Sequence, residues 1–205
     1  MNLVVLGLFS LKAQGIAGSI FLMIAHGFVS GALFFLVGAI YDRHHTRSIL
    51  YFGGLTQVMP MFSFYFFFFT MANMSFPGTC NFVGELLILV GIFQTNYLVT
   101  FLAATGVVLS AAYSIWLFNR LCFCNLKTQY IGVFKDLTKK ESIIVFSLAV
   151  LTLLTGLQPY VILSLLDHNV QSIVVTHEYA EDLEKSLKAF DDYIRDNPIE
   201  SVDDY

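Results

Sequence analysis

The sequence predicts an all-α integral membrane protein, a helical bundle in which one membrane-spanning helix is interrupted. Three observations support this prediction. Hydrophobic residues make up 57% of the 205 residues, and the mean hydropathy is +0.71. Charged residues make up only 13%, about half the share of a soluble domain. Several apolar runs also reach the ~20 residues that a helix needs to cross a bilayer.

The predicted membrane domain covers residues 1–159. Its apolar segments are a partial helix over 2–11 and spans over 16–41, 60–93, 97–121 and 142–157. The first segment is half the length of a crossing, so we interpret it as the remaining part of a longer helix. The last span ends at Gln158 and Pro159, because proline lacks the backbone N–H that would continue the helix.

The span over 60–93 is too long for one straight crossing and too short for two crossings joined by a turn. Pro77 and Gly78 lie near its middle, and both favour a break in a helix. We therefore predict one discontinuous helix, formed by residues 60–75 and 81–93 around an unwound segment. Unwound backbone at membrane depth must be shielded by protein or line a water-filled cavity.

The basic residues support a single broken crossing. Seven of the eight Lys and Arg in residues 1–176 lie in the loops 41–57 and 121–141 or at the adjoining Arg120. If the broken helix crosses once, both loops lie on the same side. The positive-inside rule favours that arrangement, because basic loops stay in the compartment from which the protein was inserted.

The C-terminal part has a different composition. Residues 160–176 are weakly amphipathic and are predicted to lie at the membrane interface. Residues 177–205 carry ten acidic and three basic residues and are predicted to form an acidic soluble tail. Leu183, Leu187 and Phe190 follow a helical spacing, which Asn197 and Pro198 would end. Two interpretations stay open: a solvated tail, or a helix that docks on a partner subunit.

Apart from tyrosines, His26 and Glu85 are the two ionisable side chains well inside a predicted span. A charge at the bilayer centre costs ~3 kcal/mol on insertion scales, so such residues usually face a bundle interior or a water path. Glu85 follows the Pro77 break, where a helix N-terminus favours the anion and loss of water disfavours it. Glu85 is either a proton carrier or a hydrogen-bond acceptor for the broken helix, and His26 is either a relay member or a core residue.

Further relay candidates are hydroxyl side chains that could hold water along a proton path. They are Ser30, Thr70, Thr79, Tyr113 and Ser114. No catalytic, cofactor or metal site is predicted. Cys80, Cys122 and Cys124 lack the spacing of a zinc or haem motif, and no glycine-rich nucleotide loop is present. The basic residues flank spans and predict no nucleic-acid partner.

Five motifs carry a resemblance to a known family. They are HGFVSGALFF at 26–35, YDRHHTR at 41–47, the Gly53-Gly54 pair, FPGTCNFVGE at 76–85 and AAYSIWLFNR at 111–120. Together they resemble the C-terminal half of the chain 4 family of mitochondrial NADH–ubiquinone oxidoreductase, an antiporter-like subunit of respiratory complex I. The similarity runs from Met1 to about Val175, and the acidic extension beyond it departs from the family.

The resemblance implies an antiporter-like bundle in which this chain forms the second half-channel. It implies that Glu85 and His26 transfer protons, and that NAD, FMN, iron–sulfur clusters and ubiquinone are held by other subunits. It places the chain in the mitochondrial inner membrane, with the basic loops in the matrix and the tail toward the intermembrane space. The expected partners are other membrane-arm subunits of the complex and lipids, with cardiolipin as one candidate.

The family's first nine helices and part of its tenth have no counterpart here. Either a separate polypeptide carries the N-terminal half of the subunit, or the chain is a piece of a longer one, and the initial Met favours the first. Two functional alternatives are also kept open. One is a subunit of a cation/proton antiporter or membrane-bound hydrogenase, against which the 41–47 motif argues. The other is a structural fragment with an inactive channel.

Overall fold

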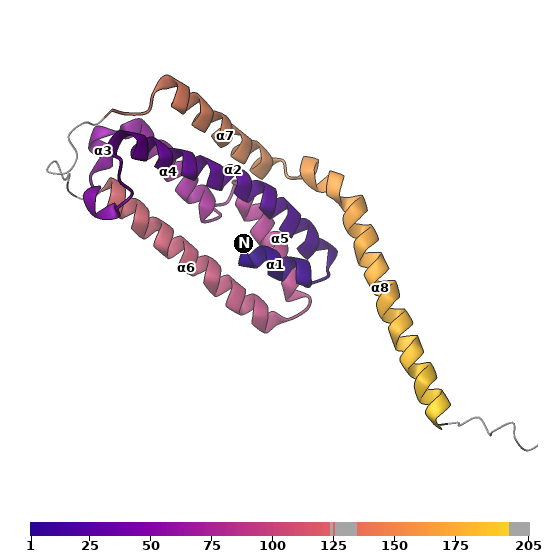
Figure 1. Cartoon of the computed structure of the whole chain (residues 1–205). Coiled ribbons are helices and arrows are strands. Elements are labelled where there is room, and N and C mark those ends of the chain that lie inside the picture. Colours follow the sequence, from indigo (N-terminus) through magenta and orange to yellow (C-terminus); the bar gives the residue numbers. More distant parts are fainter. Residues whose placement is uncertain (124, 126–134, 197–205) are drawn as a thin grey trace, which may run out of the picture.

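The computed structural model describes residues 1–123, 125 and 135–196. Within these residues the regular elements are helices and no strand occurs, which confirms the predicted all-α class. The elements in chain order are α1 (Asn2–Phe9), α2 (Ala13–His44), the 3₁₀ helix η1 (Ile49–Tyr51), α3 (Leu55–Val58), α4 (Pro60–Asn73), α5 (Cys80–Phe93), α6 (Tyr97–Cys122), α7 (Lys139–Leu157) and α8 (Tyr160–Asp196). Figure 1 shows α1 to α7 gathered in one bundle, from which α8 projects.

Of the described helices, α2, α6 and α7 are long and apolar enough to cross a membrane. The helices α4 and α5 have 14 residues each, so each is about 21 Å long and too short to cross alone. They follow one another along the bundle and together make the predicted discontinuous helix (Figure 1).

Contacts at the two ends of the bundle show which helix ends lie at the same end. At one end, Arg43 at the end of α2 forms an ion pair with Glu141 at the start of α7. At the opposite end, Gln94 Nε2 after α5 donates to Gln14 Oε1 in α2, at 2.8 Å. The first basic loop and the start of α7 therefore lie at the same end, as a single broken crossing requires.

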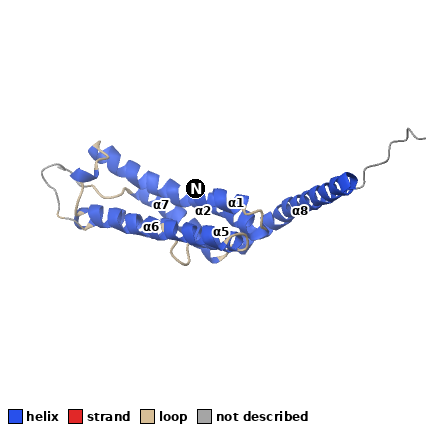
Figure 2. Cartoon of the chain, turned by 90° about the horizontal axis from the view of Figure 1, so that it is seen from below, coloured by secondary structure: helices blue, strands red, loops and turns tan. Residues whose placement is uncertain are grey.

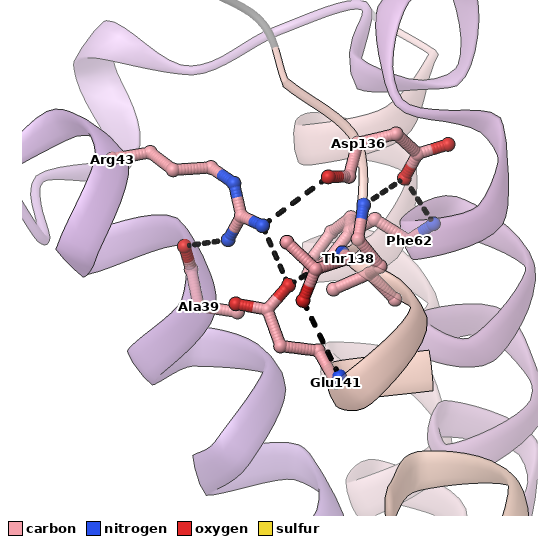
Figure 3. A network of polar contacts seen from close by, with 7 residues as sticks. Ala39, Arg43, Phe62, Asp136, Thr138 and Glu141 are labelled. Atoms are coloured by element: carbon pink, nitrogen blue, oxygen red, sulfur yellow. Dashed lines mark hydrogen bonds and ion pairs between the residues drawn. The ribbon is translucent and has the colours of Figure 1, made fainter. Parts of the chain in front are cut away.

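A polar network joins three helices at that end (Figure 3). The Nη2 atom of Arg43 donates to Glu141 Oε2 at 2.6 Å and to the backbone oxygen of Asp136 at 3.2 Å. The Asp136 carboxylate accepts from the backbone N–H groups of Met61 and Phe62 in the first turn of α4. An acidic group there stabilises a helix N-terminus. The network thus ties α2, α4 and α7 together.

The most extensive helix contact in the described part of the chain is between α2 and α5, where glycines let the backbones approach. A Cβ atom on Gly91 of α5 would lie 2.6 Å from the Cα of Gly15 in α2, and one on Gly84 would lie 2.8 Å from Leu22 Cβ. Small residues allow such packing between membrane helices, which lack a hydrophobic driving force in lipid. A hydrophobic core rich in phenylalanine lies between α2, α4, α6 and α7 and includes Phe62, Phe69 and Phe118.

The structure moves several predicted boundaries. The first half of the broken helix ends at Asn73 rather than 75, and the second half begins at Cys80. The helix α7 begins at Lys139 rather than 142, because Thr138 and Glu141 form a reciprocal capping box.

The C-terminal part also differs from the two predicted segments. Residues 160–176 and the described part of the acidic tail form one continuous helix, α8 (Figures 1 and 2). Cys124, Lys127 and the predicted stop at Asn197 and Pro198 lie outside the described residues.

Candidate functional site

The helix break is formed by a defined motif at the end of α4. Ser75 has a positive φ of 60°, its N–H donates to the oxygen of Ala72 at 3.2 Å, and the N–H of Phe76 donates to that of Met71 at 3.1 Å. These two bonds make a Schellman motif with serine in the position that glycine usually takes. The chain therefore turns out of α4 before Pro77, and the break does not depend on proline alone.

The second half of the break leads into α5. Gly78 has a φ of 96°, which glycine adopts without a steric penalty. Thr79 is extended and does not cap α5 with its side chain. Instead, its N–H and Oγ both donate to the backbone oxygen of Phe76, at 3.1 and 2.8 Å. The unwound segment is thus a compact turn, held by its own backbone.

The helix α7 covers this turn. A Cβ atom on Gly156 would lie 2.5 Å from the oxygen of Gly78 and 2.8 Å from the nitrogen of Cys80. Only a glycine lets the α7 backbone pass so close. Exposed backbone polar groups are costly in lipid, and this contact shields the unwound segment on one side.

A cavity of about 440 Å³ lies beside the break, where α1, α2, α5 and α6 meet the end of α4. Apart from Asn2 at the chain terminus, six of its lining residues have polar side chains: His26, Asn73, Asn81, Glu85, Ser110 and Tyr113. The others are Met1 to Val4, Leu22, Gly106 and Val107. Ionisable side chains within a membrane bundle usually face the bundle interior or a water path, and a cavity of this kind can admit water.

Glu85 and His26 reach the cavity from the two helices that pack most closely. Gly84 precedes Glu85 and presses on Leu22, and Leu22 lies one turn before His26 on the same face of α2. Both side chains are half-buried. Glu85 is the sixth residue of α5, and the first turn of α5 contains no acid. The influence of the helix N-terminus on Glu85 is therefore weaker than the sequence suggested, since it falls off within one turn.

Asn81 lies one turn before Glu85 in α5 and also lines the cavity. It is 3% exposed, and its Oδ1 atom has no hydrogen-bond partner among the described residues. A buried amide oxygen of this kind is stabilised by a donor. On the side of α6, Ser110 and Tyr113 are one turn apart and face the same cavity.

The structure brings together three of the predicted site residues, His26, Glu85 and Tyr113. It does not bring Ser30 and Thr79 to the cavity wall. The Ser30 hydroxyl donates to the backbone oxygen of His26 at 2.6 Å, and that of Thr79 is engaged in the turn.

Sequence reasoning did not single out Asn73, Asn81 or Ser110. The four-residue spacing of Asn81 and Glu85 is a signal that could have pointed to one of them, because it places both on one face of a helix. Within the described part of the chain, no group of three or more His, Cys, Asp or Glu side chains is placed to hold a metal ion.

A family model described as "NADH:quinone oxidoreductase/Mrp antiporter, TM" matches residues 1–111. NADH-ubiquinone oxidoreductase chain 4 of Marchantia polymorpha is 53% identical over 174 residues, which are 85% of this chain and 35% of the relative. NADH-quinone oxidoreductase subunit M of Rhodobacter capsulatus is 47% identical over 174 residues, with 85% and 34% covered. The chain thus spans about a third of the length of these relatives.

A solved structure gives the same match. In respiratory complex I from Thermus thermophilus with bound NADH, one chain superposes with a TM-score of 0.74 and 29% identity. The superposition covers 84% of this chain and 37% of that one. The antiporter-like, all-α membrane fold is therefore confirmed.

Proposed function

Because the chain belongs to the NADH:quinone oxidoreductase/Mrp antiporter membrane family, we propose that it forms the second half-channel of an antiporter-like subunit in respiratory complex I. It would carry protons, while other subunits hold NAD, FMN, iron–sulfur clusters and ubiquinone and perform the redox chemistry. One observation carries this proposal. Glu85 and His26 line the same cavity, directly beside the break in the discontinuous helix.

The chemistry of the cavity fits proton transfer. A carboxyl group and an imidazole can each accept and release a proton. The cavity of about 440 Å³ has room for several water molecules, each of which takes ~30 Å³ in the liquid. Protons would pass between Glu85 and His26 along such water, with Tyr113, Ser110 and Asn81 as hydrogen-bonding groups on the walls.

The proposed location is the mitochondrial inner membrane, with several crossings. Both basic loops would face the matrix, in line with the positive-inside rule. The helix α8 begins at the opposite end of the bundle, where Val170 packs against Ile16 and Ala17 of α2. Its distal half would then extend toward the intermembrane space.

The proposed partners are the other membrane-arm subunits and lipids, including cardiolipin. Large apolar side chains such as Phe9 of α1 and Phe101 of α6 are 80% and 69% exposed, and lipid or protein must cover them. We propose that the N-terminal half of the subunit also lies against this chain. The intact mass of this chain in the purified complex would distinguish a separate polypeptide from a longer single chain.

The substitution Glu85→Gln tests the proposal, because it removes the titrating proton and keeps the size of the side chain. We expect fewer protons pumped per electron pair in the purified, fully assembled complex. Loss of an acid–base group slows a proton-transfer step ~10²-fold or more. Glu178→Gln, the same change on an exposed part of α8, should leave the ratio unchanged.

Three results would separate the alternatives. An unchanged pumping ratio in Glu85→Gln would favour a structural fragment with an inactive channel. Glu85→Asp, which keeps the acid, should restore part of the pumping if proton transfer is the role of this residue. A cation/proton antiporter subunit would instead show sodium- or potassium-dependent exchange that is independent of NADH oxidation.

A further inference from the structure

The distal half of α8 has no role in the proposed half-channel. The helix leaves the bundle and runs outward (Figures 1 and 2). Val170 is its last buried residue, and every described side chain from 171 to 195 is exposed or half-exposed. This segment nevertheless carries a regular apolar pattern, which a purely solvated helix does not need.

The pattern is a seam with the spacing of a coiled coil. Its members recur at alternating intervals of three and four residues: Ile173, Thr176, Ala180, Leu183, Leu187, Phe190 and Ile194. Such a heptad repeat places side chains along one stripe that packs into a facing helix. Leu183 and Phe190 are 62% and 60% exposed, so large apolar side chains of the seam lie open.

The seam is distinct from the face of α8 that already has a partner. Leu166, Val170 and Val174 pack against the start of α2. At 3.6 residues per turn, the seam lies about a third of a turn away from that face. Contact with the bundle therefore leaves the seam available along its full length.

The charges beside the seam indicate what kind of surface fits it. Residues 177–196 contain seven acidic and three basic residues. The three bases form ion pairs within α8 itself: Lys185 with Asp182, Lys188 with Glu184 and Arg195 with Asp192. In the heptad, Glu184 and Asp191 border the seam on one side, where such positions set the choice of partner.

These charges disfavour two binding partners for the seam, a membrane surface and a second copy of α8. Helices that lie on membranes carry Lys and Arg on their polar face, and an acidic helix is repelled by anionic lipids. A second copy of α8 would bring one strongly acidic helix against another. We propose that residues 173–194 dock a helix of another subunit, whose apolar heptad stripe is bordered by Lys or Arg facing Glu184 and Asp191.

The test uses the assembled complex with a photo-reactive benzophenone amino acid in place of Leu187. We expect crosslinks to one peptide of a different subunit, with apolar heptads and flanking basic residues. Glu184→Lys combined with Asp191→Lys should lower the crosslink yield at least about tenfold, since like charges would then face each other. Glu178→Lys with Asp192→Lys makes the same charge change on the opposite face and should leave the yield unchanged.

Several outcomes would overturn the proposal. They are crosslinks to lipid alone, crosslinks to a second copy of this chain, or equal yields in the two double-lysine variants. Acidic residues placed at the partner's basic positions should restore the yield in the Glu184→Lys, Asp191→Lys variant. That rescue would exclude a general loss of helix structure as the cause. The experiment does not depend on proton transfer through Glu85.

Discussion

The helices α5 and α6 follow one another along the chain and are both apolar, yet other helices enclose only α5. Buried residues occur along the whole of α5, from Cys80 to Ile92. In α6 they are confined to the last third, from Ser114 to Cys122. Apolarity alone therefore indicates that a helix lies in the membrane, but not which neighbour it contacts.

The difference arises from where each helix carries small residues. Gly84 and Gly91 of α5 meet Leu22 and Gly15 of α2 at distances that leave no room for a Cβ atom. At Gly106 of α6, no heavy atom of another described element lies within 4 Å of the equivalent position. In a bilayer, close backbone packing replaces the hydrophobic effect as the cause of helix association. The glycine contacts, rather than hydropathy, thus hold α5 beside α2.

The largest expected effect on stability comes from replacing a glycine of α5 by alanine, and the same replacement in α6 is the comparison. Gly91→Ala places its Cβ atom 2.6 Å from both Cα and N of Gly15, so two backbones must separate. We expect the free energy of unfolding to fall by about 3 kcal/mol, as for severe overpacking. Gly106→Ala should raise it by about 0.5 kcal/mol, because alanine favours a helix more than glycine. Unfolding the full chain from lipid with a denaturing detergent measures both changes in free energy. Equal changes for the two variants would contradict the conclusion that glycine contacts hold α5 beside α2.

A smaller effect is expected from removing side-chain atoms. Ile88 of α5 is fully buried and Leu109 of α6 is 68% exposed. Ile88→Ala should lower the free energy of unfolding by about 2 kcal/mol, the low end of the range for such cavities, because lipid is the reference solvent. Leu109→Ala should change it by about 0.5 kcal/mol or less. A large loss for Leu109→Ala in the assembled complex would show that another subunit covers α6.

Much of the fold could be predicted because it depends on local composition. The apolar runs locate α2, α6 and α7, and Pro77 with Gly78 marks the break. The turn at Ser75 could not be predicted, because a serine with positive φ carries no sequence signal. The Arg43–Glu141 pair joins residues 98 positions apart, and no local pattern reveals such a contact.

The C-terminal part shows what a composition boundary indicates and what it does not. The sequence becomes acidic after His177, which led to separate interfacial and tail segments. No Pro or Gly lies between Tyr160 and Asp196, so nothing interrupts the backbone and one helix continues. Charge indicates the surroundings of a helix, whereas Pro and Gly indicate its ends.

For the candidate site, Glu85 and His26 were predictable because ionisable groups are rare inside spans. Asn73, Asn81 and Ser110 were not singled out, since uncharged polar side chains are common in membrane helices. They reach the cavity wall because α4, α5 and α6 pack together there, and this packing is a tertiary feature that no local sequence pattern reveals.

The smallest effect concerns the end of α6 at which its buried residues lie. The Thr56 hydroxyl in α3 donates to the backbone oxygen of Cys122 at the last turn of α6. Thr56→Val keeps the shape and removes this bond, at a cost of about 1 kcal/mol. We expect amide hydrogen exchange of that turn to accelerate about fivefold, because opening becomes easier by that amount.

Thr100→Val is the matched control for this bond. Thr100 lies in the first turns of α6, and its hydroxyl donates only locally, to the backbone oxygen of Asn96 at 2.9 Å. Its loss should change exchange at that end by about twofold or less, since no contact between helices is broken. Equal acceleration at both ends would mean that α6 is not anchored through Cys122. Its position beside the cavity would then depend on Phe118 and the other buried side chains of its last third.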